Sequence, residues 1–169
     1  MLQEASGEVI IRSFQNGDLD ACRRLYHEGL IGGQIAENDT GLDIDDIEQA
    51  YMEPEGNHFW VAVAKDTNEV VGMIGVMHCD GVGEIRRLRV SDNHRRKGIG
   101  SSLLEHAVKF CQENNYLKVA LDTFMERDPA LKLFDKFRFR HGRTRNYAGK
   151  DLLYFYLDLY TSDRKDEPA

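Results

Sequence analysis

One stretch in the middle of the chain, residues 84–105, constrains the fold more than any other. It joins a strand-like run, 84–90, to a basic turn and then to an amphipathic helix. Gly98 and Gly100 stand where the strand gives way to the helix, and glycine lets bare backbone approach a ligand closely. The helix that follows supplies unpaired N–H groups and the positive end of its dipole. The stretch therefore predicts a strand–turn–helix unit with an anion site suited to a diphosphate.

Positive side chains gather at the same turn, where Arg95, Arg96 and Lys97 follow one another. The rest of the chain is acidic, since 22 Lys and Arg face 29 Asp and Glu, for a net charge of −7. A protein that binds nucleic acid needs a basic surface, and no aromatic residues interleave these arginines. We therefore expect a local anion site and no nucleic-acid partner.

Length and cysteine content narrow the class of protein. A chain of 169 residues fits a single domain, 1–169, with its core at 9–159 and a flexible polar tail at 161–169. Three widely spaced cysteines do not form a disulfide framework, and no residues have zinc-ligand spacing, so we expect no metal. Without a long apolar run or a signal-peptide pattern, the predicted setting is the cytoplasm, with no membrane partner.

Hydrophobic periodicity predicts a mixed α/β chain, which some schemes class as α+β. The expected order is strand, two helices, three strands, a long helix, strand, helix and two strands. The strands are expected at 9–14, 58–64, 70–78, 84–90, 117–121, 139–144 and 152–159. The helices are expected after the turn at 16–18, from about Asp43 to before Pro54, after Gly100, and at 129–137.

The pattern Arg95-x-x-Gly98-x-Gly100 resembles the phosphate loop of the GCN5-related N-acetyltransferase (GNAT) superfamily, Gln/Arg-x-x-Gly-x-Gly/Ala. The run 88–90 just before it looks like the family's fourth strand. The order of expected elements is also the family's order, so the resemblance covers roughly residues 9–159.

Two other phosphate-binding patterns fit worse. A Walker loop needs a lysine after its last glycine, whereas Gly100 is followed by Ser101. A dinucleotide fingerprint needs a third glycine, and Leu103 stands in its place.

The resemblance implies a fold and a co-substrate. The fold is a mixed, mostly antiparallel central sheet of six to seven strands flanked by about four helices, and the co-substrate is acetyl-coenzyme A (acetyl-CoA). Its diphosphate would lie on the backbone N–H groups of 96–101, and its pantetheine arm would pair with 88–90. The cofactor-binding residues expected from the resemblance are Leu88, Arg89, Val90, Arg95, Arg96, Lys97, Gly98, Ile99, Gly100, Ser101 and Phe134.

Glu84 matches the position of the glutamate base in several GNAT acetyltransferases. Acetyl transfer needs a neutral amine, and a lysine-like amine with a pKa of about 10.4 is almost fully protonated at neutral pH. A base, often acting through water, removes this handicap. The resemblance thus implies an N-acetyltransferase that works by direct attack, with Glu84 as the base. The other interpretation is a carboxylate at a strand start that pairs with Arg86 or another arginine.

The chain departs from the family at three positions. Phe134 stands where the family often has a tyrosine that protonates the departing thiolate, and phenylalanine has no proton to give. We expect Phe134 to pack against the pantetheine arm instead. Arg127 replaces a cofactor-contacting asparagine, and Arg138 replaces a glycine. These departures favour, as the alternative function, a non-catalytic acyl-CoA-binding or sensing domain of the same fold.

The expected acceptor is an amine, on a small molecule or on a peptide or protein. The acidic run 37–48 would attract an ammonium-bearing acceptor, whereas Arg138, Arg140, Arg143 and Arg145 would bind a carboxylate or phosphate. The sequence leaves both interpretations open, together with the length of the acyl group and the homodimeric state that is common for this fold.

Overall fold

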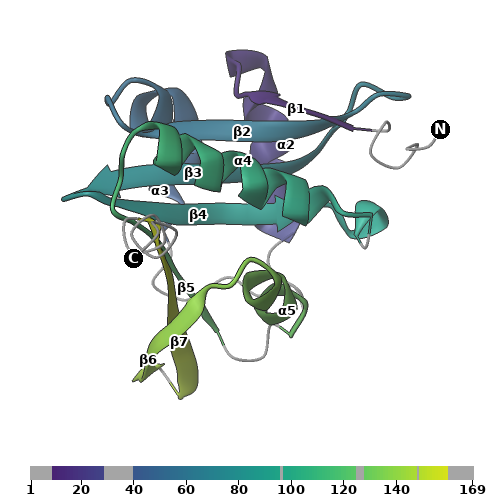
Figure 1. The fold of residues 1–169 in the computed structure, drawn as a ribbon. Helices are drawn as coiled ribbons and strands as arrows, with labels where there is room; N and C mark the ends of the chain where they lie inside the picture. Colours follow the sequence, from purple (N-terminus) through teal and green to yellow (C-terminus); the bar gives the residue numbers. More distant parts are fainter. Residues whose placement is uncertain (1–8, 29–39, 96, 125–127, 148, 160–169) are drawn as a thin grey trace, which may run out of the picture. The chain divides into compact units, whose positions relative to one another are not determined.

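Strands and helices follow one another along the chain in the predicted order (Figure 1). The computed structural model describes residues 9–28, 40–95, 97–124, 128–147 and 149–159. The strands are β1 (Val9–Ser13), β2 (His58–Ala64), β3 (Val70–Cys79), β4 (Val82–Val90), β5 (Lys118–Phe124), β6 (Arg140–Tyr147) and β7 (Lys150–Asp158). The helices are α2 (Leu19–Glu28), α3 (Leu42–Asp45), α4 (Ile99–Glu113) and α5 (Asp128–Lys136), with short helical turns η1 (Asn16–Asp18), η2 (Glu48–Met52) and η3 (Asp92–His94).

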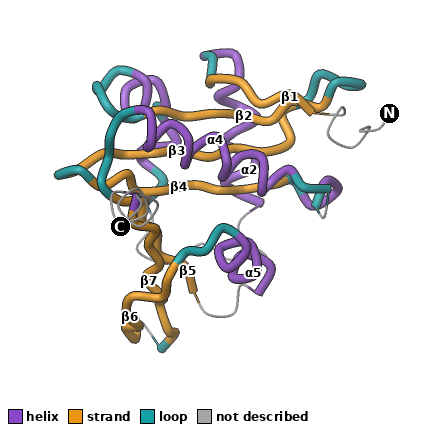
Figure 2. Tube along the Cα trace, in the orientation of Figure 1, coloured by secondary structure: helices purple, strands orange, loops and turns teal. Residues whose placement is uncertain are grey.

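The strands form one mixed sheet in the order β1-β2-β3-β4-β5-β7-β6. The pairs β1–β2, β2–β3, β5–β7 and β6–β7 are antiparallel, and the start of β4 pairs in parallel with β5. Figure 2 marks these strands in orange and the helices in purple. The predicted sheet, mixed and mostly antiparallel, is confirmed.

The chain divides into two compact units, and the division passes through β3, β4 and α4. The first unit holds residues 1–77 and 86–107, and the second holds 78–85 and 108–169. The assignment of 1–169 to a single domain stays a prediction.

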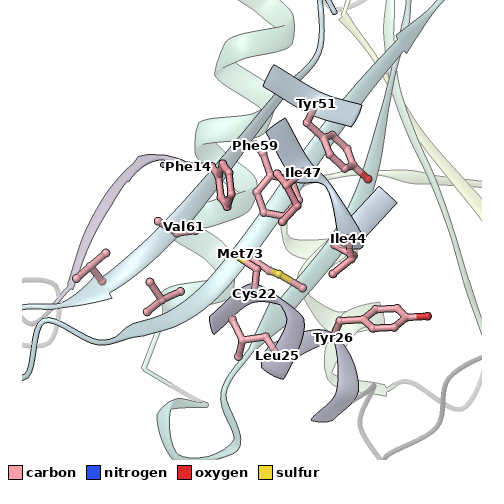
Figure 3. Close-up of a cluster of buried hydrophobic side chains, with 12 residues drawn as sticks. Phe14, Cys22, Leu25, Tyr26, Ile44, Ile47, Tyr51, Phe59, Val61 and Met73 are labelled. Atoms are coloured by element: carbon pink, nitrogen blue, oxygen red, sulfur yellow. The ribbon is translucent and has the colours of Figure 1, made fainter. Parts of the chain in front are cut away.

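In the first unit helices lie on both faces of the sheet (Figure 1), and most residues of β2 and β3 are buried. Gly72 of β3 faces α4, where an added Cβ would lie 3.0 Å from Leu103 and 3.2 Å from Ile99. Met73, the next residue, points to the opposite face and joins a buried cluster that includes Leu25 of α2 and Ile44 of α3 (Figure 3). The alternation of side chains along one strand thus holds a helical layer on each side.

The second unit is built on β5 and β7, which pair from Lys118 and Asp158 to Phe124 and Leu152. At the end of α5, Arg138 has a φ of 67°, in the left-handed region that favours glycine. Phe139 N donates a hydrogen bond to Phe134 O at 3.0 Å, which closes the helix. The left-handed turn explains why the resemblance expects glycine at Arg138.

The second predicted helix, from about Asp43 to before Pro54, is broken into α3 and η2. Asp46 leaves the helical conformation, with φ −146° and ψ 77°, and its Oδ1 accepts a hydrogen bond from Gln49 N at 3.2 Å. An aspartate that bonds to nearby backbone competes with a continuous helix. Ile44, Ile47 and Tyr51 are nonetheless buried, as their spacing predicts. The predicted tail, 161–169, lies outside the described residues.

Candidate functional site

The turn after β4 is fixed at both ends by hydrogen bonds. Ser91 N donates to Val71 O at 2.8 Å, which attaches the end of β4 to β3. Arg95 Nε donates to Val90 O at 3.2 Å, and Arg95 Nη2 lies 3.0 Å from Asp92 Oδ1. The side chain of Arg95 therefore ties the turn back to the strand, a structural role that the sequence does not reveal.

Gly98 gives the turn its conformation and its open surface. It has a φ of 82°, and a Cβ built on it meets nothing within 4 Å. Ser102 N donates to Gly98 O at 3.1 Å, so α4 begins directly after this glycine. Ile99 is 3% exposed and anchors the first turn of the helix in the core. The backbone here is both held in place and accessible.

The residues of this turn fit the diphosphate of acetyl-CoA. The 15-residue helix α4 starts at Ile99, and its first turn carries no acidic residue that would repel an anion. The first N–H groups of any α-helix have no acceptor within the helix, and its dipole is positive at that end. Lys97 is exposed beside them, and Arg96 lies outside the described residues. The open space at Gly98 is where a phosphate could approach the backbone.

Arg87 distorts the backbone of β4 just before the segment 88–90. Its φ is 58°, which is uncommon for a residue other than glycine. Its guanidinium donates two hydrogen bonds to Asp43, from Nε to Oδ2 at 3.0 Å and from Nη2 to Oδ1 at 2.6 Å. Tyr51 Oη donates a third to Asp43 Oδ2 at 2.6 Å, and Arg87 Cζ lies 5.0 Å from the centre of the Tyr26 ring. Strand, helix and aromatic core thus meet at one ion pair.

Burial and charge set the protonation states in this cluster. Burial opposes the ionisation of Asp43, but hydrogen bonds from Arg87 and Tyr51 outweigh it and hold the pKa of the carboxyl below its usual value. Burial, together with the negative charge of Asp43, raises the pKa of Tyr51. At neutral pH Asp43 is therefore a carboxylate and Tyr51 a hydrogen-bond donor.

The predicted cofactor strand, Leu88, Arg89 and Val90, forms the end of β4, and all three residues are half-buried. Arg89 Nη1 donates to Leu88 O at 3.3 Å. Together with Arg95 and the start of α4, these residues belong to the first unit, so the structure gathers most of the predicted cofactor residues in one compact body.

Glu84 and Phe134 belong to the second unit. Glu84 is half-buried on β4, opposite Ala120 of β5 in the parallel pairing. Phe134 is 4% exposed, and its ring packs against Phe139 at 5.9 Å and Phe155 at 5.7 Å between centroids. Phe134 is therefore part of an aromatic core, and its contact with pantetheine stays a prediction, as does the role of Glu84.

Two groups of charges were candidates for acceptor binding. In the acidic run, Asp43 is held by Arg87, Asp45 lies 3.6 Å from Arg23, and residues 37 and 39 are outside the described residues. On β6, Arg140, Arg143 and Arg145 are exposed, and the guanidinium of Arg143 lies 4.6 Å from the centre of the Tyr154 ring. The negative charge of Asp43, which contacts β4 through Arg87, is thus compensated within the protein.

The sequence did not identify Arg87, Asp43 and Tyr51 as a cluster. Arg87 was one of several arginines, Asp43 one of several acids, and Tyr51 one apolar position of a helix. Forty-four residues separate Asp43 from Arg87, and no local pattern links them. The only signal is an arginine in a strand beside a predicted ligand site.

Within the residues that the structure describes, no helix is long and apolar enough to cross a membrane, and no three His, Cys, Asp or Glu side chains are grouped to hold a metal ion.

Comparison with known proteins places this geometry in context. A family model described as "Acetyltransferase (GNAT) family" matches residues 20–139. The N-acetylaspartate synthetase of Xenopus tropicalis is 38% identical over 120 residues, which cover 70% of this chain and 44% of that protein. The chain spans less than half the length of this and the similar vertebrate relatives.

Solved structures share the fold. A GNAT acetyltransferase of Staphylococcus aureus Mu50 superposes with a TM-score of 0.77 at 20% identity, covering 89% of this chain and 99% of that one. The protein yncA of Salmonella typhimurium, solved with its cofactor acetyl-CoA, has a TM-score of 0.76 at 19% identity, covering 90% and 94%.

The substitution Gly98→Ala tests the turn as the phosphate site. A left-handed alanine costs about 1 kcal/mol of stability, and its methyl group occupies the open space against the backbone. The methyl group would keep the phosphates from the backbone N–H groups, so their hydrogen bonds would be lost. We therefore expect coenzyme A to bind about tenfold more weakly or worse, measured by calorimetry.

Gly149→Ala is the matched control. Gly149 has a φ of 84° and equally open surroundings, but it lies next to β7, in the turn that follows β6. The Gly149→Ala variant should lose as much stability as Gly98→Ala and keep the wild-type affinity for coenzyme A. Equal losses of affinity in both variants would exclude a specific role of the turn.

Proposed function

The chain belongs to the GNAT acetyltransferase family, and on this premise we propose that it transfers an acetyl group from acetyl-CoA to a primary amine. The observation that carries the proposal is the turn at Gly98, where accessible backbone meets the N-terminus of α4 after β4 and η3. Such a turn holds a diphosphate, and the strand beside it has N–H and C=O groups for the amides of pantetheine.

Acetyl-CoA supplies the activated thioester, and the chain supplies position and a base. The acceptor nitrogen attacks the thioester carbon, the C–S bond breaks, and the electron pair leaves on sulfur. Glu84 takes the proton of the acceptor ammonium, directly or through water. A backbone N–H near Leu88 donates a hydrogen bond to the oxyanion.

Position 134, where the family often has a tyrosine that protonates the leaving sulfur, holds a phenylalanine. A thiol with a pKa of about 8.5 forms a tolerable thiolate near neutral pH, so the reaction proceeds without a dedicated acid and water supplies the proton. The buried position of Phe134 agrees with a packing role.

We propose an acceptor that carries a carboxylate as well as the amine. Relatives named N-acetylaspartate synthetase support this class of acceptor. The compensation of Asp43 by Arg87 removes one negative charge that would have favoured a cationic acceptor, and β6 offers three exposed arginines. A homodimeric state and a cytoplasmic location stay predictions.

Turnover with a panel of amines tests the proposed function. Wild-type protein should acetylate aspartate or glutamate with a higher kcat/KM than spermidine. The reaction is monitored by the loss of thioester absorbance. This readout avoids the exposed thiol of Cys79, which would react with a thiol reagent. Tight binding of acetyl-CoA with no turnover on any amine would favour the non-catalytic sensing domain instead.

The substitution Glu84→Gln tests the base. It preserves shape and removes the proton acceptor, so kcat should fall by about 10²–10⁴-fold at neutral pH. The loss should shrink as the pH approaches the pKa of the acceptor amine, because the neutral amine then needs no base. Affinity for coenzyme A should not change. A variant with the wild-type pH profile would assign Glu84 to an arginine pair instead.

A further inference from the structure

Arg87 adopts a backbone conformation that its side chain does not favour. A positive φ strains a residue that carries a Cβ, and within a strand it bends and re-aims the chain. Such strain persists only where the surroundings enforce it. The residue lies directly before 88–90, the segment proposed to pair with pantetheine. The contacts that enforce the bend at Arg87 therefore also set the direction of the segment 88–90.

Asp43 and Tyr26 hold the side chain of Arg87. Asp43 accepts two hydrogen bonds from the guanidinium in a planar fork, which fixes the guanidinium in position and in orientation. The Tyr26 ring packs on one face at 5.0 Å. The side chains of Arg87 and Asp43 are only 13% and 14% exposed, so solvent screens the pair little.

Asp43 is itself fixed to the core. Tyr51 donates to Asp43 at 2.6 Å and is 0% exposed, and Tyr26 is 6% exposed. Figure 3 shows both tyrosine rings at the edge of the buried cluster, with their hydroxyl groups pointing out of it. An added Cβ on Gly41 would lie 2.9 Å from Tyr26 Oη, so the backbone before α3 is close-packed on this ring. The pair thus joins a rigid core to a strained strand.

A buried ion pair contributes little net stability, because desolvation offsets the attraction, but it fixes geometry. We propose that Asp43 and Arg87 form a positioning pair for cofactor binding. Asp43, which accepts a hydrogen bond from Tyr51, fixes the side chain of Arg87. Arg87 in turn stabilises the bend in β4, and this bend directs the backbone of 88–90. The pair acts without touching the cofactor. This inference rests on the proposed function, since it concerns the same strand.

The substitution Asp43→Asn tests the pair, since it keeps the shape and removes the charge that holds the guanidinium. We expect coenzyme A to bind roughly tenfold more weakly, measured by calorimetry on folded protein. Tyr51→Phe removes one hydrogen bond and should weaken binding about two- to threefold. Asp45→Asn is the matched control, because this carboxylate of α3 is 56% exposed and 3.6 Å from Arg23, and its affinity should equal wild type.

The double variant Asp43→Asn with Arg87→Gly separates positioning from simple destabilisation. Glycine tolerates the left-handed backbone but offers no anchor. If Asp43 and Arg87 act as one unit, the effects of the two substitutions do not add. The double variant then binds coenzyme A no more weakly than the single variant, Asp43→Asn or Arg87→Gly, that has the lower affinity.

Melting temperature is measured alongside affinity. Variants that melt lower but keep the wild-type affinity would overturn the inference and leave a purely structural pair. If Asp43→Asn does not fold, Tyr51→Phe decides, and wild-type affinity in that variant overturns the inference. Wild-type protein that gives no binding heat with coenzyme A would instead contradict the proposed function.

Discussion

The fork between the guanidinium of Arg87 and the carboxylate of Asp43 holds β4 in a conformation that a strand does not adopt unaided. Beyond this point the strand continues through 88–90 to the turn at Gly98 and the start of α4. The aromatic rings of Tyr26 and Tyr51 bring the fork into contact with the core. Arg87 of β4 is thereby attached to the buried core of the first unit, and the turn proposed to bind the cofactor follows β4 along the chain.

This arrangement suits a reaction that depends on position. The thioester carries its own leaving group, and the acceptor needs only to lose a proton and to meet the carbonyl in the right orientation. In the proposed mechanism, catalytic chemistry falls to few residues, Glu84 above all, whereas backbone groups bind the cofactor. Phe134 fits this division, since it is buried among Phe139 and Phe155 and offers no proton.

Much of this could be predicted from the sequence. The apolar runs at 58–64 and 70–78 predict the bounds of β2 and β3 to within a residue. Gly98 and Gly100, with the helix after them, predict the turn. The break between α3 and η2 could not be predicted, because it depends on a hydrogen bond that Gln49 N donates to the Asp46 side chain. The fork could not be predicted either, since it joins residues 44 positions apart and depends on the φ of one arginine. Local chemistry is legible in the sequence, whereas contacts between distant elements require the fold.

In the proposed binding mode, the end of β4, the turn and the start of α4 together bind the cofactor through their backbone. Amide hydrogen exchange with and without acetyl-CoA tests this directly, because it reports on each N–H group. We expect slower exchange on binding at Leu88, Val90 and the amides of 97–101, with β6 unchanged. Binding without protection at these amides, or protection confined to other strands, would contradict it.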